Sequence, residues 1–151
     1  MKFPSLLSSH SPEETEQIGR DLAQAFLTRA DLPPFVALYG DLGVGKTAFV
    51  RGFTSVIAPL SRVKSPTFAL VHEYRGKATT VFHFDMYRIE SEDDLDSIGF
   101  YDYWDRSGIC LVEWSEKIGF ALPDRYVRVE ILKDSATDTD SRQISLSAVG
   151  F

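Results

Sequence analysis

The chain has 151 residues, 44% of them hydrophobic, which predicts one compact globular domain, residues 1–151, with a core of its own. Its 16 Lys and Arg and 22 Asp and Glu give a net charge of −6, and the basic residues are scattered along the sequence. Because proteins that bind nucleic acid unaided carry a basic stripe or face, this distribution argues against that class. No segment is apolar enough to be a signal peptide or to span a membrane, so we expect a cytoplasmic protein without membrane association.

The first predicted helix begins at Ser11. Ser11 can cap it, Pro12 suits its first position and Glu14 completes a capping box. Apolar residues at helical spacing then form one face: Ile18, Leu22, Ala25 and Phe26. We expect the pair Pro33-Pro34 to end this element.

A strand, a glycine-rich turn and a second helix are expected next. Residues 35–39 form a short apolar run, which is typical of a buried parallel strand, and this strand should stop at Gly40. The second helix is expected from about Lys46 until Pro59, which lacks the amide donor that a longer helix would need.

Residues 68–74 and 79–85 are predicted to be two strands joined at Gly76. The connection is too short for a crossover, so the pair is expected to be antiparallel. A short helix should follow, capped by Ser91 and ending near Gly99.

Three further strands are predicted in the last third of the chain. Residues 109–112 are fully apolar and contain Cys110, the one cysteine, whose flanks predict a buried structural thiol with no base to activate it. Residues 127–131 alternate between apolar and charged, and residues 144–146 repeat that pattern, so two half-exposed strands should close the fold.

Residues 40–47 satisfy the pattern G-x-x-x-x-G-K-[ST], the Walker A or P-loop motif, between the predicted strand and helix. Glycines let backbone N–H groups converge on phosphates, and the helix N-terminus adds partial positive charge. Lys46 should reach the β- and γ-phosphates, and the Thr47 hydroxyl should bind Mg²⁺. The predicted nucleotide-binding residues here are Asp41, Leu42, Gly43, Val44, Gly45, Lys46, Thr47 and Ala48. The alternative is a glycine turn that binds no nucleotide.

A P-loop site also needs an acidic residue at the end of a neighbouring strand to hold magnesium. Glu113 follows the apolar strand 109–112, and ligands of open α/β sheets lie beyond the carboxyl ends of the strands. Glu113 is therefore the predicted second metal ligand. The alternative is a solvated carboxylate at a strand end.

Asp85 is a second candidate carboxylate. His83 and Asp85 share one face of their strand because side chains alternate. Asp85 could serve as a base or orient water near the γ-phosphate, or it could be a structural partner of Arg88. His72 and His83 are expected on adjacent strands, and no spacing of Cys or His supports a zinc site.

The order of four motifs resembles that of the bacterial TsaE (YjeE) family over nearly the whole chain. The motifs are the P-loop with Arg51-Gly52 downstream, Ser65-Pro66-Thr67-Phe68-Ala69-Leu70-Val71, His83-Phe84-Asp85-Met86-Tyr87-Arg88 and Val112-Glu113-Trp114. Members of this family are small ATPases needed to make threonylcarbamoyladenosine beside the anticodon of tRNA, and they act with the TsaB and TsaD proteins. Ser115 is a departure, since the family often has Pro there.

The resemblance implies a three-layer α/β P-loop NTPase fold whose central mixed sheet includes an antiparallel hairpin. It implies ATP or ADP and Mg²⁺ as ligands, with Asp85 and Lys46 as catalytic residues and Thr47 and Glu113 on the metal. Ser65 and Thr67 would belong to a switch-like loop, and Thr15 matches a family threonine near the nucleotide. By the same resemblance, tRNA is contacted only indirectly, through the complex.

Three rival functions share the P-loop. A small-molecule or nucleotide kinase needs an acceptor pocket and usually an Arg-bearing lid, and the sequence has no Arg cluster. A GTP switch needs an Asn-Lys-x-Asp motif, which a chain without Asn lacks. A nucleotide-dependent binding module, reset by hydrolysis, overlaps with the family role.

Hydrolysis by the isolated chain is expected to be slow. Neither internal candidate for an arginine finger is convincing, because Arg88 can pair with Asp85 and Arg51 should point away from the γ-phosphate. Partners would then supply the missing charge or order the switch-like loop. Trp114, next to the predicted metal ligand, should report on Mg-nucleotide by its fluorescence.

Overall fold

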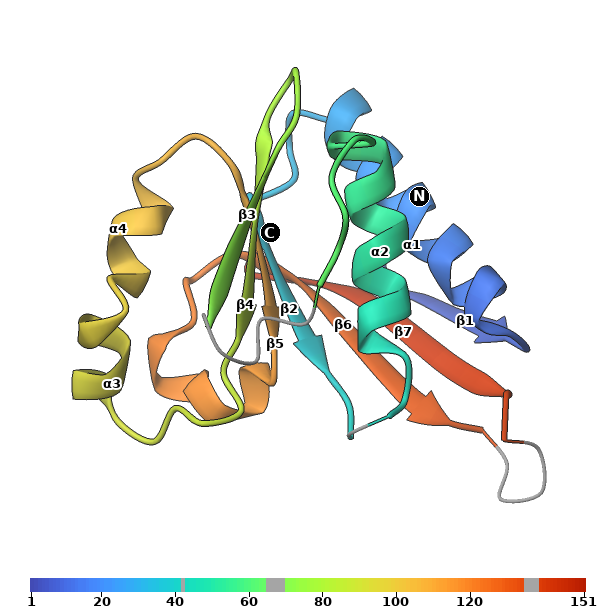
Figure 1. Cartoon of the computed structure of the whole chain (residues 1–151). Helices are drawn as coiled ribbons and strands as arrows, with labels where there is room; N and C mark the ends of the chain where they lie inside the picture. Colours follow the sequence, from blue (N-terminus) through green and yellow to red (C-terminus); the bar gives the residue numbers. More distant parts are fainter. Residues whose placement is uncertain (42, 65–69, 135–138) are drawn as a thin grey trace.

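The computed structural model describes residues 1–41, 43–64, 70–134 and 139–151, and within them seven strands form one mixed sheet between two layers of helices (Figure 1). The strands are β1 (Ser5–Ser9), β2 (Phe35–Tyr39), β3 (Val71–Arg75), β4 (Thr80–Asp85), β5 (Ile109–Glu113), β6 (Tyr126–Lys133) and β7 (Arg142–Val149). The helices are α1 (Pro12–Thr28), α2 (Lys46–Ile57), α3 (Glu92–Ser97), α4 (Phe100–Trp104) and the 3-10 helix η1 (Ser115–Ala121).

The strand order is β1-β7-β6-β2-β5-β4-β3. The centre is parallel, since β2 pairs in parallel with both β5 and β6, and β5 pairs in parallel with β4. Both edges are antiparallel, through β1 with β7, β7 with β6, and β3 with β4. The predicted mixed sheet and its antiparallel hairpin are therefore confirmed.

The helices bury a different set of side chains on each face of the sheet. On one face, α1 and α2 pack on Val36 and Leu38 of β2. On the other face, α3, α4 and η1 pack on Phe35 and Ala37 of the same strand. Because successive side chains of a strand point to opposite faces, the uniformly apolar β2 serves both cores, as expected for a central parallel strand.

The start of α1 follows the predicted capping pattern with one difference. The Ser11 hydroxyl accepts a hydrogen bond from the Glu14 amide at 3.1 Å, and Pro12 occupies the first helical position. The Glu14 carboxylate, however, accepts from the His10 amide at 2.7 Å and not from that of Ser11. The Glu14 carboxylate thus binds the amide of the residue before the N-cap, and this hydrogen bond holds the segment that follows β1 against the start of α1.

Three elements were not predicted, and two of them, β1 and α4, depend on partners far away in the sequence. β1 is an edge strand of serines and leucines that pairs with β7, and its Leu6 is exposed. α4 follows Gly99, which has a left-handed backbone, and buries Phe100 against Phe35 and Phe84. η1 begins directly after β5.

Two smaller predictions, the burial of Cys110 and the end of the first helix, can be compared with the structure. Cys110 is buried in β5, as predicted, and burial raises the pKa of its thiol to about 12. α1 ends at Thr28, before the proline pair that was expected to end it. The last hydrogen bond of the helix runs from the Arg29 amide to the Ala25 carbonyl. None of the helices in the described parts of the chain has the length and apolar character needed to cross a membrane.

Candidate nucleotide site

The P-loop connects the C-terminal end of β2 to the N-terminus of α2 (Figure 1). Gly40 has a φ of 148°, and a Cβ there would lie 2.7 Å from the carbonyl oxygen of Ile131, so this position requires glycine. Gly45 caps α2 in a left-handed conformation with a φ of 109° and has no side chain to satisfy the first amides of the helix. A helix N-terminus left in this way can bind an anion such as phosphate.

Lys46 occupies the centre of the site. Its ammonium donates a hydrogen bond to the Gly40 carbonyl at 2.5 Å and lies 3.7 Å from the centre of the Trp114 ring, with only 5% of the residue exposed. Burial lowers the pKa of Lys46, and nearby carboxylates oppose that shift, first Glu113, then Glu116, Asp85 and Asp41. The ammonium is therefore largely desolvated and lies within electrostatic reach of four carboxylates.

Glu113 ends β5 beside this lysine. Its residue is 5% exposed, and Oε2 lies 2.5 Å from Nε2 of His83 on β4. The alternative of a solvated carboxylate at a strand end is therefore wrong. The structure brings Glu113 and Lys46 together at the carboxyl end of the parallel strands, where ligands of such sheets bind.

Asp85 ends β4 and is aligned with Glu113 in the strand register. Burial raises the pKa of Asp85, the Tyr87 backbone amide lowers it by donating a hydrogen bond at 2.9 Å, and the charge of Glu113 raises it again. Arg88 forms no ion pair with Asp85, both residues being in the described part of the chain. The predicted alternative of an Asp85–Arg88 pair is therefore wrong.

The residues at this end of the sheet fit a magnesium ion. Within the described ranges no group of three His, Cys, Asp or Glu side chains could hold a metal unaided. Mg²⁺ in nucleotide sites, however, uses one or two protein oxygens together with phosphate oxygens. Thr47 in the first turn of α2 and Glu113 offer such oxygens, and a cation would relieve the repulsion between Glu113 and Asp85.

A cavity of about 250 Å³ lies between the P-loop and the start of α1. It is lined by Ser11, Pro12, Thr15, Gly43, Val44, Gly45, Ala48, Arg51, Asp140 and Arg142. Thr15 is buried, and its hydroxyl lies 2.7 Å from that of Ser9. Five residues predicted at the nucleotide, Thr15, Gly43, Val44, Gly45 and Ala48, thus line one cavity.

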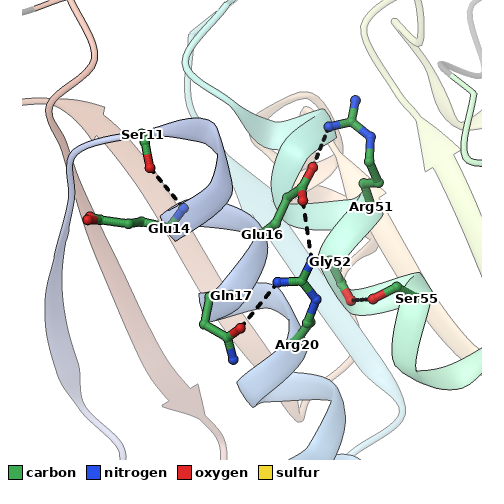
Figure 2. A network of polar contacts seen from close by, with 8 residues as sticks. All are labelled: Ser11, Glu14, Glu16, Gln17, Arg20, Arg51, Gly52 and Ser55. Atoms are coloured by element: carbon green, nitrogen blue, oxygen red, sulfur yellow. Dashed lines mark hydrogen bonds and ion pairs between the residues drawn. The ribbon is translucent and has the colours of Figure 1, made fainter.

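Arg142 and Arg51 line this cavity, and neither was predicted there. The Arg142 guanidinium donates to the Val44 carbonyl at 2.8 Å, and it comes from β7, far from the P-loop in sequence. Arg51 forms an ion pair with Glu16 of α1, with 2.7 Å between Nη1 and Oε1, and Figure 2 shows the two side chains pointing toward each other. Arg51 is thus held toward α1.

The remaining predicted residues lie at the rim of the site or outside the described residues. Asp41 is exposed at the start of the loop. Trp114 follows Glu113 with a left-handed backbone and contacts both Lys46 and the Tyr87 ring, whose centre is 4.9 Å away. The Ser115 hydroxyl donates to the Val112 carbonyl at 2.7 Å. Leu42, Ser65 and Thr67 lie outside the described residues.

Comparison with known proteins decides the family. The model of the family described as "Threonylcarbamoyl adenosine biosynthesis protein TsaE" matches residues 9–144. The chain belongs to the TsaE family. The resemblance noted in the four motifs is therefore confirmed.

Two relatives are named "tRNA threonylcarbamoyladenosine biosynthesis protein TsaE". The one from Bacillus subtilis (strain 168) is 39% identical over 140 residues, which are 93% of this chain and 83% of the relative. The one from Haemophilus influenzae is 37% identical over 145 residues, 94% of this chain and 89% of the relative. A solved structure titled "Crystal structure of Bacillus subtilus YdiB" superimposes with a TM-score of 0.73 at 32% identity, covering 99% of this chain and 90% of that one. The TsaE family has a P-loop NTPase fold, and the architecture of this chain matches it.

Proposed function

We propose that this chain is a Mg²⁺-dependent ATP-binding protein and slow ATPase, required for the threonylcarbamoyladenosine modification of tRNA next to the anticodon. In this proposal it acts as one domain in the cytoplasm, together with TsaB and TsaD, and meets tRNA only through that complex. The observation that carries the proposal is the buried Lys46 ammonium, held at the P-loop between the helix N-terminus and two strand-end carboxylates. Membership of a family named for this modification supports the rest.

Phosphate binding is assigned to the P-loop and the first turn of α2. The amides of residues 43–47 converge on the β-phosphate, and Lys46 exchanges its contact with the Gly40 carbonyl for phosphate oxygens. Lys46 is already desolvated, so its new contacts are made in a medium of low polarity, where they are strong. The cavity beside Thr15 and Ala48 is then the place for the nucleoside end.

Hydrolysis is assigned to the strand-end carboxylates. Thr47 and Glu113 hold Mg²⁺, which when bound neutralises charge on the phosphates. Asp85 orients the attacking water or accepts its proton, a role suited to a carboxyl group whose pKa is raised by burial. Ser65 and Thr67 are proposed to lie in the switch-like loop that completes the site when partners bind.

The P-loop assignment is tested by Lys46→Ala. We expect the dissociation constants of ATP and ADP to rise about 30-fold, equivalent to about 2 kcal/mol for a desolvated charge-assisted contact. Lys77→Ala is the matched control, because Lys77 is exposed at the hairpin turn and should leave both constants unchanged. Unchanged affinity in a folded Lys46→Ala protein would refute the assignment.

The dependence on partners is tested by phosphate release. The isolated chain should turn over well below the tens per second of a typical enzyme, and TsaB with TsaD should accelerate it. The reconstituted mixture should form threonylcarbamoyladenosine on tRNA with the wild-type chain and not with Lys46→Ala. Rapid turnover that TsaB and TsaD leave unaltered would refute the partner-dependent mechanism, and phosphate found on an acceptor molecule would favour a kinase.

A further inference from the structure

His83 lies inside the site, yet the proposed function gives it no role. Its side chain is fully buried on β4, and Nε2 lies 2.5 Å from Oε2 of Glu113. In the register between the strands, His83 is opposite Leu111, two residues before Glu113, so the contact runs diagonally across β4 and β5 toward the P-loop. It occupies one of the two carboxylate oxygens of Glu113.

The hydrogen bonds of His83 assign its proton. Nδ1 is buried and has no hydrogen-bond partner among the described residues. A proton on Nδ1 would be a buried donor without an acceptor, which is costly, whereas a bare ring nitrogen without a partner costs less. The proton therefore belongs on Nε2, which donates it to the Glu113 carboxylate.

The ring of His83 is also fixed from the side. The Tyr74 ring lies with its centre 6.1 Å from that of His83. Tyr74 is anchored in turn, since its hydroxyl accepts from the Lys64 amide at 3.0 Å and donates to the Lys64 carbonyl at 3.2 Å. The donor that meets Glu113 is thus held in one place by packing.

Two neighbouring charges, Lys46 and Asp85, also act on the Glu113 carboxylate. Lys46 attracts its carboxylate, since Glu113 heads the carboxylates that raise the pKa of Lys46, and Asp85 repels it. An ion pair between Glu113 and Lys46 would engage both the phosphate ligand and the metal ligand, and this attraction favours rotation of Glu113 toward Lys46. A site that binds both phosphate and Mg²⁺ therefore needs a contact that keeps the Glu113 carboxylate away from the Lys46 ammonium.

We propose that His83 is a positioning residue for the metal site. Its Nε2–H holds Oε2 of Glu113, so that the carboxylate keeps away from Lys46 and its other oxygen stays available to Mg²⁺. A donor behind a metal-ligating group fixes that group's orientation in many metal sites, and removing it commonly weakens metal affinity by about 10- to 100-fold. The inference rests on the proposed function in one respect, the assignment of Glu113 as a ligand of Mg²⁺.

The test compares His83→Gln with His83→Asn. The Gln amide nitrogen reaches about as far as Nε2 of histidine, whereas that of Asn reaches only as far as Nδ1, so the two variants have the same chemistry and differ in reach. The readout is the Mg²⁺ concentration that half-saturates the Trp114 fluorescence change in the presence of ADP. We expect His83→Asn to raise this concentration about tenfold and His83→Gln to stay within about threefold of wild type.

The control is His72→Asn. His72 is the cross-strand partner of His83 on β3 and stacks on the same Tyr74, but it forms no hydrogen bond with Glu113. The His72→Asn variant should leave unchanged the Mg²⁺ concentration that half-saturates the fluorescence change. Affinity for ADP in EDTA should change less than about twofold in all three variants, because the effect acts through the metal.

The outcomes distinguish a failure of the positioning role from a failure of the proposed function. If wild type shows Mg²⁺-dependent binding and His83→Asn matches His83→Gln, the positioning role is refuted while the proposed function stands. If the wild-type fluorescence does not respond to Mg²⁺ at all, the metal site of the proposed function is refuted. Equal loss of ADP affinity in EDTA and in Mg²⁺ would show a structural role and overturn the inference.

Discussion

The two faces of the sheet are held together in different ways. On the face that carries the P-loop helix, α1 and α2 pack backbone to backbone at glycines, since a Cβ on Gly52 would lie 1.9 Å from the Glu16 carbonyl oxygen. On the other face, the short helix α4 packs on the sheet through aromatic rings, with Phe100 against Phe35 and Phe84. The first face fixes the position of the P-loop with little tolerance, and the second fills volume beneath the site.

The largest effect is expected for Gly52→Ala. The new methyl group would collide with the backbone of α1, which cannot move aside as a side chain can, so the two helices must separate. We expect loss of the stable native state, measured by urea denaturation, with nucleotide binding lost as well. Gly119→Ala in η1 is the control, because a Cβ there meets nothing within 4 Å, and it should change stability by less than about 0.5 kcal/mol.

Phe100→Ala should have the next largest effect. Phe100 is fully buried in the aromatic core, and truncation of such a side chain typically lowers the free energy of unfolding by about 3 to 5 kcal/mol. Because this core lies on the face away from α1 and α2, the fraction that remains folded should still bind ADP with near wild-type affinity. If the folded fraction of Phe100→Ala instead loses ADP affinity, packing on this face also determines the geometry of the nucleotide site, and the two faces do not act independently.

A smaller difference is expected between the caps of α1 and α3. Ser11 and Ser91 each accept a hydrogen bond from an amide in the first turn of their helix, and Ser→Ala at such a cap costs about 1 kcal/mol. Ser11→Ala should also weaken nucleotide binding, since Ser11 lines the cavity beside the P-loop. Ser91→Ala should cost similar stability, measured by thermal unfolding, and leave binding intact. Equal effects on binding would contradict the assignment of that cavity to the nucleotide.

The smallest effect is expected for Arg51→Ala. The ion pair of Arg51 with Glu16 joins α2 to α1, but the arginine side chain is 52% exposed, and such pairs contribute about 0.2 to 1 kcal/mol. The change in unfolding free energy should be at the low end of this range and should shrink in 1 M salt. A loss as large as that of Phe100→Ala would show that charge, and not backbone contact, holds this face together.

Much of the fold could be predicted because its signals are local. The P-loop pattern between an apolar run and a helical one identified β2, the phosphate loop and α2, and a short glycine turn identified the β3–β4 pair. Because side chains alternate along β4, Phe82 and Phe84 lie on the face opposite His83. In each case the spacing of neighbouring residues determines the local geometry.

Motifs along the sequence named most residues of the candidate site, and their roles in binding and hydrolysis stay predictions. Lys46, Glu113 and Asp85 were expected at one end of the sheet, and the structure brings them together. The alternative in which Asp85 pairs with Arg88 was wrong, because the Asp85 carboxylate accepts a hydrogen bond from the Tyr87 amide instead. The contribution of Arg142 to the cavity had no signal in the sequence.

By itself, the sequence determined the P-loop, the buried strand that precedes it and, through four short motifs, the family, because each motif consists of residues that are neighbours along the chain. Only the tertiary structure decided that Ser5–Ser9 is a strand, that Phe100–Trp104 is a helix, and that His83 meets Glu113. The physical reason is the same in each case. β1 needs the hydrogen bonds of β7, α4 needs the aromatic rings beneath it, and the hydrogen bond of His83 joins two strands whose pairing is formed only when the sheet closes.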